Sequence, residues 1–109
     1  MSADSPSAGD LRAFERDLLY AVRALEHDKD TPPKGLAIKS RLEIEYPEEV
    51  NHSRLYQNLD KLVERDLLQK AEKDGRTNEY GTTDASKQLL EAHAQRRADA
   101  VGLHGGSSK

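Results

Sequence analysis

Apolar residues recur at three- and four-residue steps between residues 11 and 27, and this spacing predicts an amphipathic helix. Leu19 and Ala21 widen its apolar stripe, so we expect the helix to be buried on more than one side. Prolines at positions 32 and 33 forbid helical continuation and predict a connecting segment there. The stripe itself consists of Leu11, Phe14, Leu18, Val22 and Leu25.

Two further helices are expected before the middle of the chain. The first is short, covers residues 34–44 and ends at a Tyr-Pro pair. The second covers residues 52–65 and follows a capping residue, either Asn51 or Ser53. The apolar positions of the short helix are Leu36, Ile38, Leu42 and Ile44. Those of the longer helix are Leu55, Leu59, Leu62 and Val63.

Two short strands and a last helix complete the pattern. Strands over residues 67–72 and 77–81 flank a segment whose Asp-Gly pair is typical of a hairpin turn. Either Thr82 or Thr83 then caps a helix that ends near residue 101. Because polar groups interrupt the apolar side of this helix, we expect that side to face a partner. The side consists of Leu89, Leu90, His93, Arg97 and Val101.

The order of these elements predicts a mainly α fold with a small β-hairpin wing. Three helices, a hairpin and a fourth helix correspond to a winged helix-turn-helix with an added C-terminal dimerisation helix. We place the winged helix-turn-helix domain at residues 11–82 and the dimerisation helix at residues 83–101. Residues 1–10 and 102–109 lack periodicity and predict a flexible arm and a flexible tail.

The polar face of the third expected helix is the most informative surface in the sequence. In a helix-turn-helix, this helix enters the DNA major groove. The donors and acceptors of Arg54 match the guanine edge, and those of Gln57 or Asn58 match adenine. We expect phosphate contacts from Ser53, Lys61 and the helix start, and wing contacts from the hairpin tip. The alternative is that this face is simply solvated. The residues concerned are Asn51, His52, Ser53, Arg54, Gln57, Asn58, Lys61, Lys73 and Arg76.

Composition narrows the possible functions. The 109 residues fit one domain, and 35% hydrophobic against 34% charged residues predicts a thin core. The net charge of −3 argues against a non-specific polyanion binder, so DNA binding would depend on where the charges lie. No run of 18 apolar residues and no signal pattern is present, so we expect no membrane association and a cytoplasmic location.

The sequence offers little for catalysis or metal binding. Cysteine is absent, which excludes disulfides and thiolate chemistry. Neither a catalytic Ser/His/Asp motif nor a glycine-rich phosphate loop is present, and the histidines lack metal-ligand spacing. We therefore expect no enzyme activity, no metal and no cofactor. The histidines concerned are His27, His52, His93 and His104.

From Phe14 to Ala98, the sequence resembles the PadR-like family of winged-helix transcription regulators. Gly35-Leu36-Ala37-Ile38 resembles the family's Gly-aromatic-Glu-Ile at the start of the second helix. The recognition helix is matched by residues 55–62, which begin with Leu-Tyr. Arg65-Asp66-Leu67-Leu68 resembles the entry to the wing, and Tyr80-Gly81-Thr82-Thr83 followed by Leu89-Leu90 resembles its exit and the next helix.

Three positions depart from the family pattern. Asp66 and Ser86 stand where glycine is usual, and Thr82 stands where leucine is usual. With one helix after the wing, the chain resembles the short subgroup, which leaves a small-molecule effector unknown. The acidic, cysteine-free composition indicates a salt-loving archaeal member, and we expect a stress-responsive regulator.

The resemblance implies a homodimer on a palindromic operator, with half-sites roughly 34 Å apart or a multiple of that distance. It also implies that Tyr56 lies near the DNA backbone. A single monomeric core is the alternative to the dimer, and a winged-helix protein-interaction module without DNA contact is the alternative function. The residues expected at the dimer interface are Leu11, Phe14, Leu18, Leu89, Leu90, His93, Arg97 and Val101.

Overall fold

Four helices and one two-stranded hairpin make up the part of the chain that the structure describes. The computed structural model describes residues 12–72, 74–75 and 77–103. The expected arm and tail therefore lie outside the described residues, except for positions 102 and 103. In chain order the elements are α1 (Ala13–Lys29), α2 (Gly35–Glu43), α3 (His52–Glu64), β1 (Leu68–Glu72), β2 (Asn78–Thr82) and α4 (Asp84–Ala100). Both the winged helix-turn-helix order and the added C-terminal helix agree with the sequence prediction.

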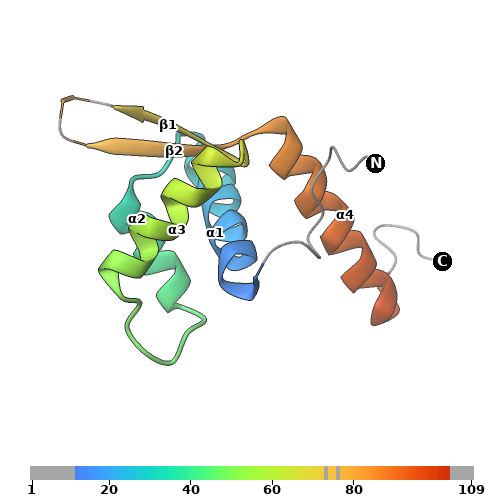
Figure 1. Cartoon of the computed structure of the whole chain (residues 1–109). Helices are drawn as coiled ribbons and strands as arrows, with labels where there is room; N and C mark the ends of the chain where they lie inside the picture. The colour runs from blue at the N-terminus through green and yellow to red at the C-terminus, as the bar shows by residue number, and fades with distance from the viewer. Residues whose placement is uncertain (1–11, 73, 76, 104–109) are drawn as a thin grey trace.

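Helix α1 is the centre of the molecule. It contacts α2, α3, α4 and β2, while α2 and α4 lie on opposite sides of it (Figure 1). The wide apolar stripe of α1 is explained by these neighbours within one chain. Leu18, Leu19 and Val22 are completely buried.

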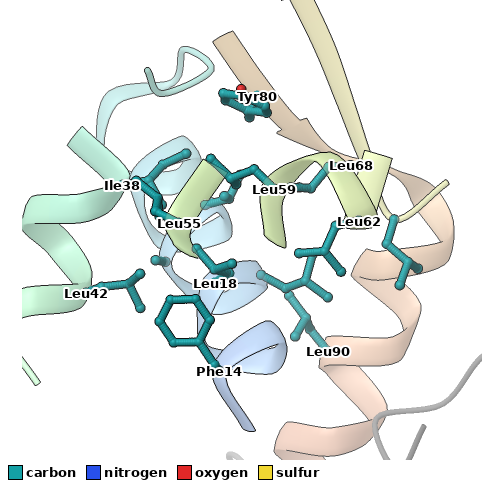
Figure 2. Packing of buried hydrophobic residues seen from close by; sticks show 14 of the residues in the cluster. Phe14, Leu18, Ile38, Leu42, Leu55, Leu59, Leu62, Leu68, Tyr80 and Leu90 are labelled. Carbon is teal, nitrogen blue, oxygen red and sulfur yellow. The ribbon is translucent and has the colours of Figure 1, made fainter. Parts of the chain in front are cut away.

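The core lies between α1, α3 and the hairpin (Figure 2). Helix α3 contributes Leu55, Leu59 and Leu62, all with no exposed surface, and β2 contributes Tyr80, which is 1% exposed. This packing fixes the rotation of α3 about its own axis, because its buried stripe can face only the core. The opposite side of α3 is therefore held toward solvent.

The hairpin is tied to the helical body. Its strands pair antiparallel, with Lys70 opposite Tyr80. The backbone N–H of Tyr80 also donates to the carbonyl of Pro33 at 2.9 Å, and Lys34 forms a bridge with Glu79. The connection between α1 and α2 thus runs beside β2 and supports the wing.

Local capping explains where the helices begin. The Asn51 side chain accepts from the N–H of Arg54 at 2.9 Å, so Asn51 and not Ser53 caps α3. Thr83 caps α4 through a reciprocal pair of bonds with Ser86. Asp66 has φ 61°, a left-handed conformation that favours glycine, which explains why this turn usually carries glycine.

Two of the four apolar positions in and just after α2 are not buried. Leu36 is 62% exposed and Ile44, which follows the helix, is 74% exposed. Ile38 and Leu42 are four residues apart and share one face, which is buried. Leu36 and Ile44 lie two residues before and after that pair, so they point about half a turn away from it.

Four residues expected at a dimer interface are instead core residues of one chain. Phe14 is 6% exposed, Leu18 0%, Leu89 5% and Leu90 4%. Leu89 and Leu90 of α4 belong to the same buried cluster as Phe14 and Leu18 of α1, as the alternative of a single monomeric core implies. The monomeric alternative therefore accounts for these four residues. Leu11 lies outside the described residues.

Candidate nucleic-acid interface

The N-terminal half of α3 is open to solvent and carries no acidic residue in its first turn. Asn51, His52 and Ser53 are all exposed. The side chain of Asn51 is already engaged as the cap, so its role is to start the helix. No carboxylate in that turn therefore neutralises the positive end of the α3 helix dipole.

The outward side of α3 is formed by Ser53, Gln57 and Lys61. These residues are four apart, lie on successive turns and are all exposed. They lie opposite Leu55 and Leu62, so the core holds this row in a fixed direction. Gln57 presents both an acceptor and two donors from the second turn of the helix.

The side chain of Arg54 does not join this row. Its guanidinium carbon lies 3.9 Å from the centroid of the Phe14 ring, on the α1 side of α3. Phe14 in turn meets the Tyr46 ring edge-on, with 5.9 Å between centroids. Helical spacing puts the Cα atom of Arg54 at the edge of the polar face of α3, but it does not determine where the side chain points. The long side chain reaches back to an aromatic surface, where a cation is favoured.

The same corner contains a strongly held tyrosine. The Tyr46 hydroxyl donates to Asp17 at 2.7 Å. Burial of the phenol, followed by its bond to Asp17, raises the pKa of Tyr46 to about 12, and the nearby Arg54 opposes this rise. Arg54 therefore belongs to a packed contact between α1, α3 and the segment after α2.

Asn58 is also turned away from the outward row. It is half-buried, and its side-chain Nδ2 donates to the Arg54 carbonyl at 2.8 Å. This bond uses one of the two amide N–H groups and holds the side chain along its own helix, away from a base edge. Of the three residues expected to read bases, only Gln57 has an outward side chain without such an attachment.

Two acidic residues lie on the same side of α3, and the sequence analysis overlooked one of them, Asp60. Asp60 and Glu64 are exposed and follow Gln57 by three and seven residues. Asp60 pairs with Lys70 of the wing at 3.4 Å, and the two side chains are 57% and 38% exposed. Counting acidic residues at helix position i+3 from Gln57 would have found Asp60.

Tyr56 packs against the start of α2. A Cβ added at Gly35 would lie 2.6 Å from Cζ of Tyr56, so no side chain fits there unless the ring moves. Tyr56 also contacts the His52 ring, with centroids 4.8 Å apart. Two parts of the family resemblance, 21 positions apart in the sequence, are thus in direct contact. A hollow beside them is lined by Lys34, Gly35, Leu36, Tyr56, Thr77 and Asn78.

The wing adds exposed polar groups near this region. Gln69, Lys70, Glu72 and Asp74 are exposed. Lys73 and Arg76, the two cations expected at the hairpin tip, lie outside the described residues. The interface thus has a fixed helix row at its centre and mixed charge around it.

The expected dimer residues of α4 that lie outside the core form a separate region. His93 is half-buried against α1, while Arg97 is exposed and Val101 is 71% exposed. Leu103, just after the helix, is 64% exposed. These apolar and basic groups lie on the opposite side of α1 from α2 (Figure 1).

Neither a metal cluster nor a membrane span is found in the described part of the chain. Within it, no three or more His, Asp or Glu side chains cluster in a way that could hold a metal ion. None of its helices combines the length and apolarity needed to cross a membrane.

Comparison with solved structures identifies similar proteins. RosR of the halophilic archaeon H. salinarum, in crystals grown from NaBr, is 36% identical, with a TM-score of 0.76; the match covers 94% of this chain and 84% of RosR. A complex structure of hsRosR-S1 is 40% identical, with a TM-score of 0.75 and coverage of 85% and 78%. The S. aureus MepR–DNA complex shares the fold at 16% identity, with a TM-score of 0.68 and coverage of 86% and 62%.

Sequence comparison gives the family. No curated protein is similar enough to count as a match. The sequence model of the transcriptional regulator PadR-like family matches residues 24–92, which include α2, α3, the wing and the first half of α4. The chain therefore belongs to the PadR-like family of winged-helix transcription regulators.

Proposed function

We propose that this regulator is a homodimer that binds a palindromic DNA operator, with the outward row of α3 in the major groove. The proposal rests mainly on one row of side chains, Ser53, Gln57 and Lys61. They are exposed on one side of α3, whereas Leu55, Leu59 and Leu62 on its other side are completely buried. An α-helix fits the major groove, and a glutamine amide pairs with the adenine edge. Gln57 is therefore the residue assigned to base recognition.

Phosphate contacts would come from the residues around this row. Lys61 extends from the third turn of α3, and Lys34 is exposed at the start of α2. The exposed start of α3 adds backbone N–H groups and His52, which favour a phosphate. Tyr56, Lys73 and Arg76 remain proposed backbone or minor-groove contacts. These groups would set the position of α3, while Gln57 would supply the base preference.

The dimer proposal rests on the distal half of α4. From residue 91 onward the helix is exposed apart from partial burial at His93 and Ala98. Val101 and Leu103 expose apolar surface at its end. Short helices without tertiary packing are marginal in water, so a second copy covering this half would stabilise it. Two chains related by a two-fold axis would match an operator with two-fold symmetry.

A protein-interaction module without DNA contact is the second candidate. Asp60 and Glu64 favour it, because carboxylates on the outward side of α3 repel phosphates. A basic protein partner would instead be attracted to them. Both candidate functions are compatible with the expected role in stress response. Selection on DNA is therefore the experiment that distinguishes a DNA-binding regulator from a protein-interaction module.

The test is selection of the full chain on random duplex DNA at high salt. We expect enrichment of a palindrome and, for Gln57→Ala, loss of preference at one base pair per half-site by about 1–3 kcal/mol. Gln88→Ala is the matched control, because Gln88 is exposed on α4, far from the α3 row in sequence. Absence of any enriched sequence would reject DNA recognition, and equal behaviour of the two variants would reject the role of Gln57.

A further inference from the structure

A histidine, His93, lies at the junction between α1 and α4. Leu89 and Leu90 anchor the first half of α4 in the core. Beyond them, His93 contacts α1, and its ring lies 5.6 Å from the Tyr20 ring between centroids. His93 thus attaches to α1 a helix half that is otherwise exposed apart from partial burial at Ala98.

Hydrogen bonding fixes the protonation state of this histidine. Arg97 Nε lies 3.2 Å from His93 Nε2 and can only donate, so Nε2 must be the unprotonated acceptor. A neutral ring then carries its proton on Nδ1, which donates to the Tyr20 oxygen at 2.7 Å. The Tyr20 hydrogen remains available for the Leu90 carbonyl at 3.3 Å. All four groups are satisfied only when His93 is neutral.

Protonation of His93 disrupts this arrangement. A proton on Nε2 removes the acceptor used by Arg97 and places two cations in contact. The charged groups facing the ring are Arg16 and Asp17 on α1 and Arg96 and Arg97 on α4. Three of these four are cations, and Asp17 is also engaged by Tyr46. The surroundings therefore favour the neutral ring.

The direction of the pH effect follows from this preference. Burial, then Arg16, Arg97 and Arg96, lowers the pKa of His93 below its usual 6.5, with Asp17 opposing the decrease. A detached histidine then binds a proton more readily than the attached one. The attachment is thus complete above pH 6.5 and weakens as the pH falls through that value toward the lowered pKa.

We propose that His93 is a proton-sensitive latch that holds the distal half of α4 against α1 when neutral and releases it when protonated. Release of α4 would change dimerisation and operator affinity when the pH falls. This regulatory consequence rests on the proposed function. The latch itself concerns only contacts within one chain. It can therefore be tested without DNA.

The test is hydrogen exchange and histidine titration by NMR on the full chain. Between about pH 7.5 and pH 5, we expect the protection factors of the distal α4 amides to fall about two- to tenfold, the range for one lost hydrogen bond. His93→Gln should remove this pH dependence. His27→Gln, at the exposed end of α1, is the matched control and should keep it. Unchanged protection in the wild-type chain would overturn the latch.

A second variant separates the latch from a purely structural role of the ring. Arg97→Met changes an exposed side chain, so the fold is preserved, and it removes both the donor and a cation beside Nε2. The pKa of His93 should then rise. A lowered or unchanged pKa in Arg97→Met would contradict the assigned bond.

The regulatory consequence has its own readout. If acidification changes α4 protection but leaves operator affinity and the dimer mass unchanged, the link to DNA binding is rejected and the latch stands. If affinity depends on pH equally in wild-type and His93→Gln chains, another group controls it, and the regulatory role of His93 is rejected.

Discussion

At the residue scale, side-chain reach decides which groups of α3 are open to make the proposed DNA contacts. Periodicity correctly indicated the polar side of this helix. It could not indicate that Arg54 extends to Phe14, or that Asn58 bonds to its own helix backbone. Both outcomes depend on residues brought close only by folding or by one rotamer choice. Gln57 is left as the central outward amide.

Arg54→Ala should therefore lower stability without changing base preference. Loss of the cation over the Phe14 ring is expected to cost about 0.5–1 kcal/mol, the range for an exposed site. Urea unfolding measures the first effect, and DNA selection measures the second. Arg23→Ala, an exposed residue of α1, serves as the comparison. A changed base preference in Arg54→Ala would show that Arg54 leaves Phe14 to contact DNA.

Gly35→Ala should be destabilising because Tyr56 occupies the space of the added methyl group. We expect a loss of about 1–3 kcal/mol in the free energy of unfolding, as for other overpacked sites. Removing the hydroxyl in Tyr56→Phe should relieve part of this loss. The double variant Gly35→Ala with Tyr56→Phe should then be more stable than the sum of the single variants predicts. Simple additivity would disprove the contact.

At the element scale, the sequence predicted every helix and strand, with boundaries within two residues of the observed ones. Capping residues and the Asp-Gly turn are local signals, so they could be identified directly. The placement of α4 was harder. Leu89 and Leu90 formed a narrow stripe that suggested a partner chain, but the second buried side of α1 accommodates them. Only the packing of two elements distant in sequence reveals this.

Thr83 illustrates how one local signal supports a long-range contact. It caps α4 and also donates to the Asp66 carbonyl at 2.8 Å, which joins the start of α4 to the end of α3. Thr83→Ala is expected to cost about 1–2 kcal/mol of unfolding free energy. Ser40→Ala, at an exposed position within α2, should be close to neutral. Equal unfolding midpoints for the two variants would contradict the capping role.

At the scale of the whole molecule, charge placement matters more than the net charge of −3. The outward side of α3 combines Lys61 with Asp60 and Glu64, so it is not a basic patch. At about 1 M salt the Debye length is about 3 Å, and such charges act only on groups in near contact. Recognition in high salt would then depend on amide contacts and shape rather than on long-range attraction.

Glu64→Gln should strengthen operator binding about two- to fivefold at roughly 0.1 M salt, and the gain should vanish near 1 M. The matched change Asp28→Asn removes the same charge from an exposed residue near the end of α1, which is assigned to neither DNA nor dimer contacts, and should have a smaller effect. Titration of labelled operator at both salt concentrations gives the comparison. Equal gains for the two variants would mean that net charge alone, and not the position of Glu64, controls affinity.

The most direct test of groove recognition uses the absence of cysteine from the chain. A single Ser53→Cys variant carrying a tethered iron chelate would cleave DNA wherever the start of α3 lies. We expect two cleavage clusters on a selected palindrome, roughly 34 Å apart, and no such pair from the same reagent at Gln88→Cys. Cleavage that is absent, unpaired or identical for the two positions would contradict placement of α3 in the major groove.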